Sequence, residues 1–406
     1  MNQVNIINYE ERPLQNIRMR VVLNMHLQGI KDCLIILVIA ISCAACVTES
    51  NPSTTISDPE DPQANIDSEG PKEKIDPVDP KEDTEMDSEL PANMTLSAGG
   101  RVLALKFDSQ NINDRDGLDD SELKLLSNQV YQSFEDEFDF IFFVSAFTSQ
   151  AQPSSFNYSG RYSSVSASEK GLGFTPYNYS EAYGSAGRLQ GVIHLTKVEA
   201  IRQGPSLHEL MHRWGNFALP STYYSHWAFA SSGLTQGGQL GGFSLNSLAD
   251  LGGGEYQADN GRGDNFGVFA NGGNGLPYSS YELYLMGLAS EGELADFTYF
   301  DDAQWLDTSL GKFSSLRGPQ TLSVNEALRH MGGAREPIYG HSQDTFRILT
   351  VLIYEDALDT ELMNKLDSEL ELFARVGSDD SSLYNFYEAT RGRASLEVAE
   401  LENAIK

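Results

Sequence analysis

The stretch 47–98 limits, more than any other feature, what this chain can fold into. It holds 14 acidic and 3 basic residues and 7 of the chain's 15 prolines, with few large apolar side chains. Such a composition buries too little apolar surface to offset the entropy lost on folding. We therefore expect an acidic, proline-rich, disordered tether with a root-mean-square reach of about 40 Å. A packed core has to be sought in residues 99–406.

The residues before the tether have the features of a secretory signal. Lys31 precedes the apolar run Leu34–Ile41, and small residues follow it up to Cys46. The run is too short to span a bilayer, so a cleaved signal is favoured over an internal transmembrane anchor. Such a signal begins more naturally at Met19 or Met25 than at the first residue of the chain.

All three cysteines lie within residues 1–46. This region resembles a bacterial lipoprotein signal, in which a cysteine becomes the lipid-modified first residue of the mature protein. Cys46 fits that position after Ala44-Ala45, and Cys43 is the alternative. The resemblance implies a lipid anchor in the bilayer of the bacterial cell envelope, at the outer membrane or the cell surface.

Residues 99–406 carry 41 acidic and 21 basic residues and no cysteine. A net charge of −20 argues against a nucleic-acid partner, which requires clustered Lys and Arg. An exported domain without cysteine has no disulfides, so a large core and bound metal have to stabilise it. The length suffices for one large domain or two closely packed halves, about 99–217 and 218–406.

The hydrophobic pattern of this part predicts a mixed α and β fold. Apolar runs predict buried strands, and the 3.6-residue period predicts helices that cover them. The expected strands are Arg101–Phe107, Phe138–Phe147, Gly191–Thr196 and Phe346–Tyr354, and the expected helices are Asp119–Glu135, one from Asp359 or Thr360 to Gly377, Ser381–Arg391 and Ser395–Ile405.

Residues 208–212 read His-Glu-Leu-Met-His. In a helix, which Ser206 would cap and Gly215 would end, His208 and His212 lie on one face and present two imidazoles to one metal ion. Zinc is the usual occupant of such a site, since it accepts neutral imidazole and keeps a fourth position open for water. Glu209 is placed to take a proton from that water, as the general base of a hydrolase.

A strand followed by such a helix resembles the zincin metallopeptidases. The resemblance implies an α+β fold with a mixed sheet, an active-site helix, an irregular glycine-rich lower half and C-terminal helices. It also implies that the strand Gly191–Thr196 is the sheet edge along which an extended substrate lies.

The third metal ligand departs from the pattern of one group of zincins. Metzincins have a glycine three residues after the second histidine, as Gly215 is here, but their third histidine falls at Ala218. His226 is the nearest candidate for the ligand, and Glu255 is its main rival. Asp250 and Asp259 follow, and the segment 281–287 offers Glu282 as a ligand or Met286 beneath the metal, unless it is a buried apolar helix.

Residues 231–276 contain 14 of the 36 glycines and no Gly-Lys-Ser/Thr, so phosphate binding is not expected. Loops of this kind either wall a substrate cleft or form short hairpins. Asp259, Asp264 and Asn265 are candidate ligands of a structural Ca²⁺. The stretch 113–117 resembles part of a calcium loop but lacks its last glutamate, so a helix-entry turn is expected there.

These features predict an exported, membrane-tethered, zinc-dependent endopeptidase that hydrolyses peptide bonds of a protein or peptide substrate. A neighbouring tyrosine would stabilise the oxyanion, and the candidates are Tyr223, Tyr224, Tyr256 and Tyr284. The alternative from another class is a non-catalytic surface-binding or adhesion lipoprotein that keeps the fold. The intact Glu209 argues against it, because a structural zinc site needs no base.

Overall fold

A computed structural model describes residues 90–107, 118–146, 159–220, 225–398 and 400–406 of the chain. The predicted signal with Cys43 and Cys46, most of the predicted tether and the stretch 113–117 lie outside these residues. Residues 83–406 belong to one compact unit, and β1 (Met94–Leu96) pairs with β2. Folded structure therefore begins before residue 99, where the tether was predicted to end.

A mixed sheet forms the centre of the α+β fold. Its order is β1-β2-β16-β3-β7-β4, with β17 also paired to β16. The strands β2, β16, β3 and β7 run parallel, while β1 and β4 are antiparallel to their neighbours. The bounds are β2 Val102–Lys106, β3 Phe140–Ser145, β4 Gly160–Ser164, β7 Gly191–Leu195, β16 Thr345–Tyr354 and β17 Ser395–Val398.

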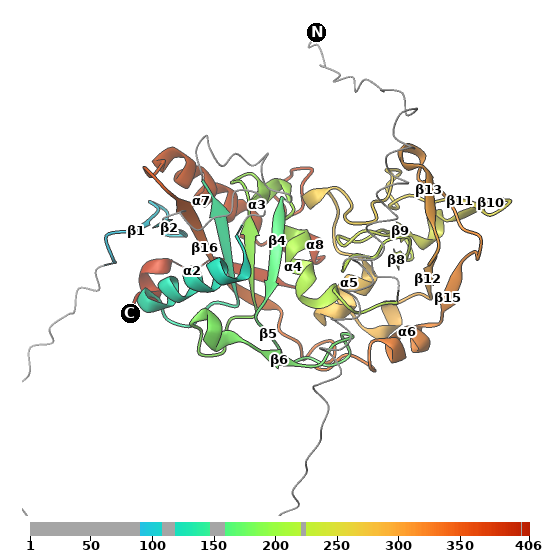
Figure 1. Ribbon diagram of the computed structural model, residues 1–406, viewed down its shortest axis with the longest axis horizontal. Helices are drawn as coiled ribbons and strands as arrows, with labels where there is room; N and C mark the ends of the chain where they lie inside the picture. The colour runs from blue at the N-terminus through green and yellow to red at the C-terminus, as the bar shows by residue number, and fades with distance from the viewer. Residues whose placement is uncertain (1–89, 108–117, 147–158, 221–224, 399) are drawn as a thin grey trace, which may run out of the picture. The chain divides into compact units, whose positions relative to one another are not determined.

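The central strands are near-continuous apolar runs. Such runs suit strands that are buried on both sides, and here helices cover both faces of the sheet. Phe140 and Phe142 point to one face and pack with helices α4, α7 and α8, whereas Ile141 and Phe143 point to the other and pack with α2. Figure 1 shows α2 lying across the sheet. The seven helices of the described residues are α2 Asp120–Ser133, α3 Ala200–Gln203, α4 Ser206–Gly215, α5 Ser280–Met286, α6 Val324–His330, α7 Thr360–Ala374 and α8 Phe386–Ala389.

Strand β7 is not the edge of the sheet. The sequence predicted a strand at Gly191–Thr196, which is confirmed, but β4 pairs with its outer side and occupies the edge. The alternation in β4 is weak, since its five residues are Gly-Arg-Tyr-Ser-Ser and only Ser163 is buried. The expectation that the 191–196 strand is the edge of the sheet is therefore wrong, and the antiparallel β4 forms that edge.

Residues 226–322, the glycine-rich half, contain short strands and one dominant helix, α5. Four strands pair in the order β10-β11-β14-β13, and two further pairs are β12-β15 and β8-β9. A separate aromatic core that includes Phe243, Phe300 and Phe313 lies beneath them. The strands are β8 Ser231–Gly233, β9 Phe243–Ser244, β10 Ala249–Gly252, β11 Glu255–Gln257, β12 Phe297–Tyr299, β13 Gln304–Asp307, β14 Lys312–Ser314 and β15 Gln320–Leu322.

The C-terminal residues return to the sheet, so the predicted lower half 218–406 is not one structural half. We call the sheet with its helices the sheet half; it combines residues from both sides of the glycine-rich half. Helix α7 begins after its cap Asp359, as predicted. Ser395–Val398, predicted as part of a helix, is instead strand β17, because its backbone pairs in parallel with Thr345–Ile348. The helix predicted at 381–391 shortens to α8.

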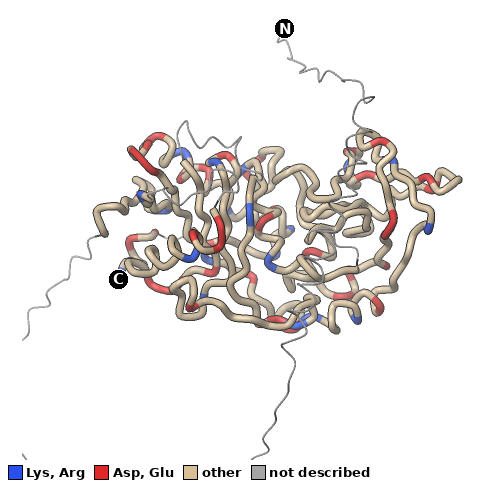
Figure 2. Tube along the Cα trace, in the orientation of Figure 1, with Lys and Arg blue, Asp and Glu red and all other residues tan. Residues whose placement is uncertain are grey.

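Charged residues of both signs are spread along the described part of the chain. Figure 2 shows acidic residues along both halves of the described chain, with basic residues scattered among them. Within the described residues, no helix is long and apolar enough to cross a membrane.

Candidate metal centre

Helix α4 carries His208, Glu209 and His212, as the sequence predicted. Its apolar side consists of Leu207, Leu210, Met211 and Trp214, which are all buried in the core between sheet and helices. Because residues four apart share a helix face, burying the apolar side fixes the direction in which the two histidines point.

The start of α4 differs from the prediction. Ser206 is the first helical residue and donates its hydroxyl to the carbonyl of Ile201, so it does not cap the helix. Asn274, from the glycine-rich half, bonds the first turn of α4 and the helix before it. Its Oδ1 accepts the Leu207 N–H at 3.3 Å, and its Nδ2 donates to two carbonyls of α3. Asn274 is fully buried. Nothing in its sequence surroundings indicated this role.

His226 joins the two helix histidines. The ligand-capable nitrogens of His208, His212 and His226 lie within 4.8 Å of one another. The Nε2 of His208 is 3.1 Å from that of His212 and 3.2 Å from that of His226. The ring of His226 lies nearly parallel to that of His208 and perpendicular to that of His212. The structure thus brings together the three residues that the sequence selected.

These distances and hydrogen bonds fit a metal ion. Two nitrogens bound tetrahedrally to zinc at 2.0–2.1 Å are about 3.3 Å apart, close to the observed separations. The Nδ1 of His208 donates to the carbonyl of Gln239 at 2.7 Å, and the Nδ1 of His212 is 2.5 Å from Oδ1 of Asn216. Each bond places the proton on Nδ1 and leaves the Nε2 lone pair directed at the centre of the cluster.

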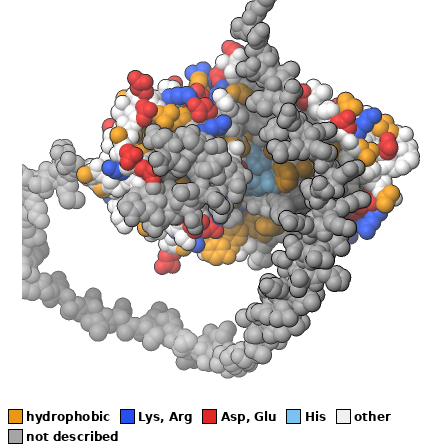
Figure 3. Space-filling model, turned by 45° about the horizontal axis from the view of Figure 1, so that its top comes forward, with side chains coloured by type: hydrophobic (Ala, Val, Ile, Leu, Met, Phe, Trp, Pro, Cys, Tyr) orange, Lys and Arg blue, Asp and Glu red, His pale blue; other side chains and the backbone are white. Residues whose placement is uncertain are grey.

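The environment also keeps the helix histidines neutral. Burial lowers the pKa of His208 to about 4 and that of His212 well below its usual range. A metal ligand must be the neutral imidazole, so the protein itself supplies the required protonation state. Figure 3 shows histidine side chains at the surface of one face with hydrophobic side chains beside them. His212 and His226 are partly exposed, so a small molecule can reach the cluster.

Glu209 lies between α4 and the edge strand β4. It is 5% exposed, and its carboxylate accepts the backbone N–H of Tyr162. A Cβ placed on Gly160 would come within 2.7 Å of Glu209 Oε1, so the strand approaches the carboxylate closely only because residue 160 is glycine. Burial raises the pKa of Glu209 to about 8. A nearby cation would lower that pKa again, into the range useful to a general base.

The rival third ligands lie elsewhere. Glu255 is exposed on the hairpin of β10 and β11, opposite Ser314 of β14. Asp250 Oδ1 accepts the N–H of Gly252, and Asp259 Oδ1 accepts that of Gly261. Among the described residues, only the three histidines form a group of three or more His, Cys, Asp or Glu side chains that could hold one metal ion. The Ca²⁺ site considered at Asp259, Asp264 and Asn265 stays a prediction.

Glu282 has a different role from the one considered in the sequence. It is fully buried in the first turn of α5, where one oxygen accepts the N–H of Ser279 at 2.8 Å and the other accepts that of Leu240 at 2.9 Å. It therefore holds the backbone next to Gln239, whose carbonyl orients His208. The Ser-x-x-Glu pattern at 279–282 is a capping signature from which the sequence predicts the first of these bonds but not the second.

The other candidates among the described residues pack in the core or bond the backbone. Met286 is in the core, and the segment 281–287 is the buried helix α5. The hydroxyl of Tyr284 accepts the N–H of Arg335, and Tyr256 packs against Phe300. Tyr223 and Tyr224 lie outside the described residues. Phe269, which the sequence did not single out, contacts the His226 ring edge-on at 5.4 Å.

No protein-family model, no curated protein and no solved structure matches this chain. Functional assignment therefore rests on the geometry of the side chains.

Proposed function

We propose that this protein is a zinc-dependent peptidase that hydrolyses peptide bonds with a water molecule activated at the His208–His212–His226 cluster. The observation that carries the proposal is the convergence of three imidazoles, two of them kept neutral by burial, beside a buried glutamate on the helix of His208 and His212. Three protein ligands leave a fourth position for water, which is the arrangement of catalytic rather than structural zinc.

Each residue then has a definite task. The three histidines hold the metal, while the carbonyl of Gln239 and the side chain of Asn216 keep two of the rings oriented. When bound, zinc supplies a water of lowered pKa and polarises the scissile carbonyl. The carboxylate of Glu209 accepts the proton of the attacking water and returns it to the leaving nitrogen.

The surroundings of the cluster support a polypeptide substrate. Phe269, beside His226, is 47% exposed and offers an apolar surface to a substrate side chain. The antiparallel edge strand β4 contacts α4 beside Glu209. The proposal takes the protein to be exported and held at the cell envelope through Cys46 or Cys43.

The decisive test is the substitution Glu209→Gln in the full chain. Glutamine keeps the shape and accepts the Tyr162 N–H but cannot take up a proton, so turnover should fall by at least about a hundredfold. Zinc content, measured by elemental analysis, should stay unchanged, and cleavage is measured on an unfolded protein such as casein.

Glu122→Gln is the matched control. Glu122 is likewise a buried glutamate on a helix, in α2 on the other face of the sheet, and its substitution should leave cleavage unchanged. A Glu209→Gln protein that cleaves as fast as the parent would overturn the assigned mechanism.

A further inference from the structure

A cavity on the sheet half is lined by none of the three histidines. It has a volume of about 340 Å³, in the range of small-molecule sites. Three of its polar side chains, Asp139, Gln190 and Gln343, come just before β3, β7 and β16, so the cavity is at the amino ends of parallel strands. Arg213 of α4 lines it, but neither the histidine cluster nor Glu209 does. We call it the polar cavity.

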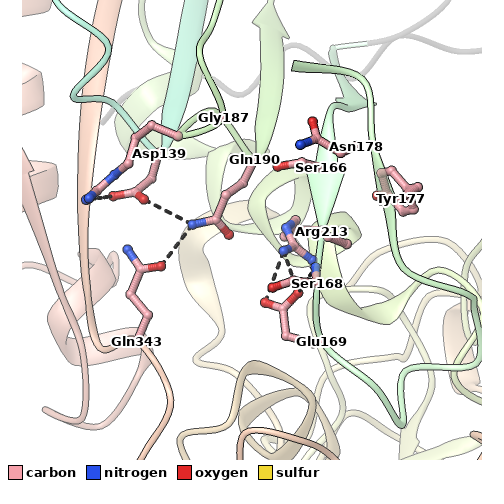
Figure 4. A pocket seen from close by; sticks show the side chains of 12 residues that line it. Asp139, Ser166, Ser168, Glu169, Tyr177, Asn178, Gly187, Gln190, Arg213 and Gln343 are labelled. Atoms are coloured by element: carbon pink, nitrogen blue, oxygen red, sulfur yellow. Dashed lines mark hydrogen bonds and ion pairs between the residues drawn. The ribbon is translucent and has the colours of Figure 1, made fainter. Parts of the chain in front are cut away.

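The polar side chains of this cavity are held in place by one another. Gln190 Nε2 donates to Asp139 Oδ1 at 3.0 Å and to Gln343 Oε1 at 2.9 Å. Arg188 donates to the other oxygen of Asp139, which is almost fully buried. Figure 4 shows this chain of contacts on one side of the cavity and the pair formed by Arg213 and Glu169 on the other. A rigid polar wall of this kind is organised before any ligand arrives.

Charge and composition select the class of ligand. Among the lining residues, two acidic side chains are each paired with one basic side chain, so the cavity has no net charge that would attract an ion. Most of the other lining side chains are amides and hydroxyls, which disfavours an apolar ligand. Among the described residues, no side chain or backbone group bonds to Ser168 Oγ, Tyr177 OH or Asn178 Nδ2. Ser168 and Asn178 are exposed and Tyr177 is partly exposed, so these groups can bond a ligand that both donates and accepts.

Aromatic surface lies beside these groups. Tyr177 lines the cavity and stacks on Tyr179 at 5.5 Å, and the Tyr179 ring is 59% exposed. An aromatic face is apolar and takes C–H groups, whereas hydroxyls act as donor and acceptor at once. A second polar cavity, lined by Ser180, Glu181, Ser185 and Ala186, shares Asn178 with the first.

We propose that the polar cavity binds a neutral hexose unit of a carbohydrate and that the adjoining cavity holds a second, linked unit. A sugar ring combines C–H faces with several hydroxyls and carries no charge, which suits the polar lining and the paired charges of the polar cavity. A carboxylate such as Glu181 in the adjoining cavity accepts hydrogen bonds from sugar hydroxyls. The proposal is independent of the zinc-peptidase assignment, because no metal-cluster residue lines either cavity.

The test uses the full chain and four probes: methyl β-D-glucopyranoside, methyl β-D-galactopyranoside, cellobiose and lactose. Binding is followed by saturation-transfer NMR and calorimetry. For a ligand of this size we expect a dissociation constant of about 1 mM for at least one methyl glycoside. The corresponding disaccharide should bind more tightly, since it reaches the adjoining cavity.

Substitutions locate the site. Gln190→Ala and Gln343→Ala should each weaken binding by about tenfold or more, because each removes part of the polar wall. Gln343 is exposed and lies outside helices and strands, so its substitution should leave the fold intact. Gln304→Ala, which changes an exposed glutamine of β13, is the matched control and should change nothing.

His208→Ala separates this proposal from the peptidase assignment, since it should abolish zinc binding and leave carbohydrate binding intact. The proposal is overturned if none of the four probes binds saturably or if Gln343→Ala binds them as the parent does.

Discussion

The two halves of the folded unit position the histidines of the cluster by different physical means. In the sheet half, the central strands are five to ten residues long and buried, and a ten-residue helix presents two of the histidines. In the glycine-rich half, strands of two to four residues surround the loops that carry His226 and Gln239. The geometry of the sheet half follows from the regular spacing of residues in its strands and helices. The glycine-rich half has too little regular structure for its geometry to arise in that way.

Buried polar side chains replace regular structure in the glycine-rich half. Asn271 Nδ2 donates to the carbonyls of Gly238 and Gly242 at 2.9 and 2.8 Å, and Glu282 accepts the N–H of Leu240. All of these bonds surround the segment that contains Gln239. Because an unpaired buried polar group is costly, each such side chain fixes the backbone that it bonds. The position of the Gln239 segment therefore depends on individual side chains such as Asn271 and Glu282.

The largest effect should come from the histidine that the glycine-rich half supplies. His226→Ala leaves two imidazoles, too few to hold catalytic zinc firmly, and should weaken zinc binding by about a thousandfold, or about 4 kcal/mol. The measurement is competition with a chelator of known affinity.

Glu255→Ala is the matched control and should leave zinc affinity essentially unchanged. The reverse result, with affinity lost in Glu255→Ala and kept in His226→Ala, would show that the glycine-rich half contributes a carboxylate and that the third-ligand assignment is wrong.

The next prediction concerns how burial in the sheet half affects the protonation of His194. His194 of β7 is fully buried and bonds Ser145, and burial lowers its pKa to about 3. The unfolded chain takes up a proton near pH 6.5 while the folded protein does not, so this contribution to stability is intact above pH 6.5 and is lost as the pH falls toward 3. Between pH 6.5 and 4 the loss should be about 3 kcal/mol.

His194→Gln removes this titration, and urea unfolding at the two pH values measures the difference from the parent. His330→Gln, at an exposed position of α6, is the control and should behave as the parent. An equal loss of stability on acidification in parent and His194→Gln would mean that the sheet interior does not exclude the proton.

The smallest effect concerns the side chain that organises the Gln239 segment. Glu282→Gln replaces one acceptor oxygen by an amide NH₂, so one backbone N–H loses its partner and the Gln239 carbonyl is held less firmly. Zinc affinity should fall about thirtyfold, or about 2 kcal/mol, as for other residues that orient metal ligands.

Two further observations separate this role from general destabilisation. Glu122→Gln alters a comparable buried capping glutamate of α2 and should leave zinc affinity intact. Nitrogen NMR of the metal-free protein should show that the hydrogen bond from the Nδ1–H of His208 to Gln239 is weakened in Glu282→Gln and unchanged in Glu122→Gln. Identical zinc affinities in the two variants would show that Glu282 does not help to orient His208.

Several elements could be predicted from the sequence because their causes are local. The runs of β2, β3, β7 and β16 are apolar enough to indicate burial on both faces, and the capping residues Asp119 and Asp359 mark the starts of α2 and α7. Strand β4 escaped prediction because its five residues lack an apolar run. The sequence predicts a helix at β17 because the pairing of this strand with β16, about fifty residues away, leaves no sign in the local pattern.

The sequence by itself determined the chemistry of this protein's centre: two imidazoles and a carboxylate on one helix, because helical spacing is a local property. Only the tertiary structure decided which third residue faces them, why His208 is held in one tautomer, and how closely β4 approaches Glu209. Those outcomes depend on contacts between segments far apart in the chain, made by Gln239, Asn274, Glu282 and Gly160. Bringing such distant segments together costs chain entropy that only the packing of the whole unit offsets, so no local sequence pattern predicts these contacts.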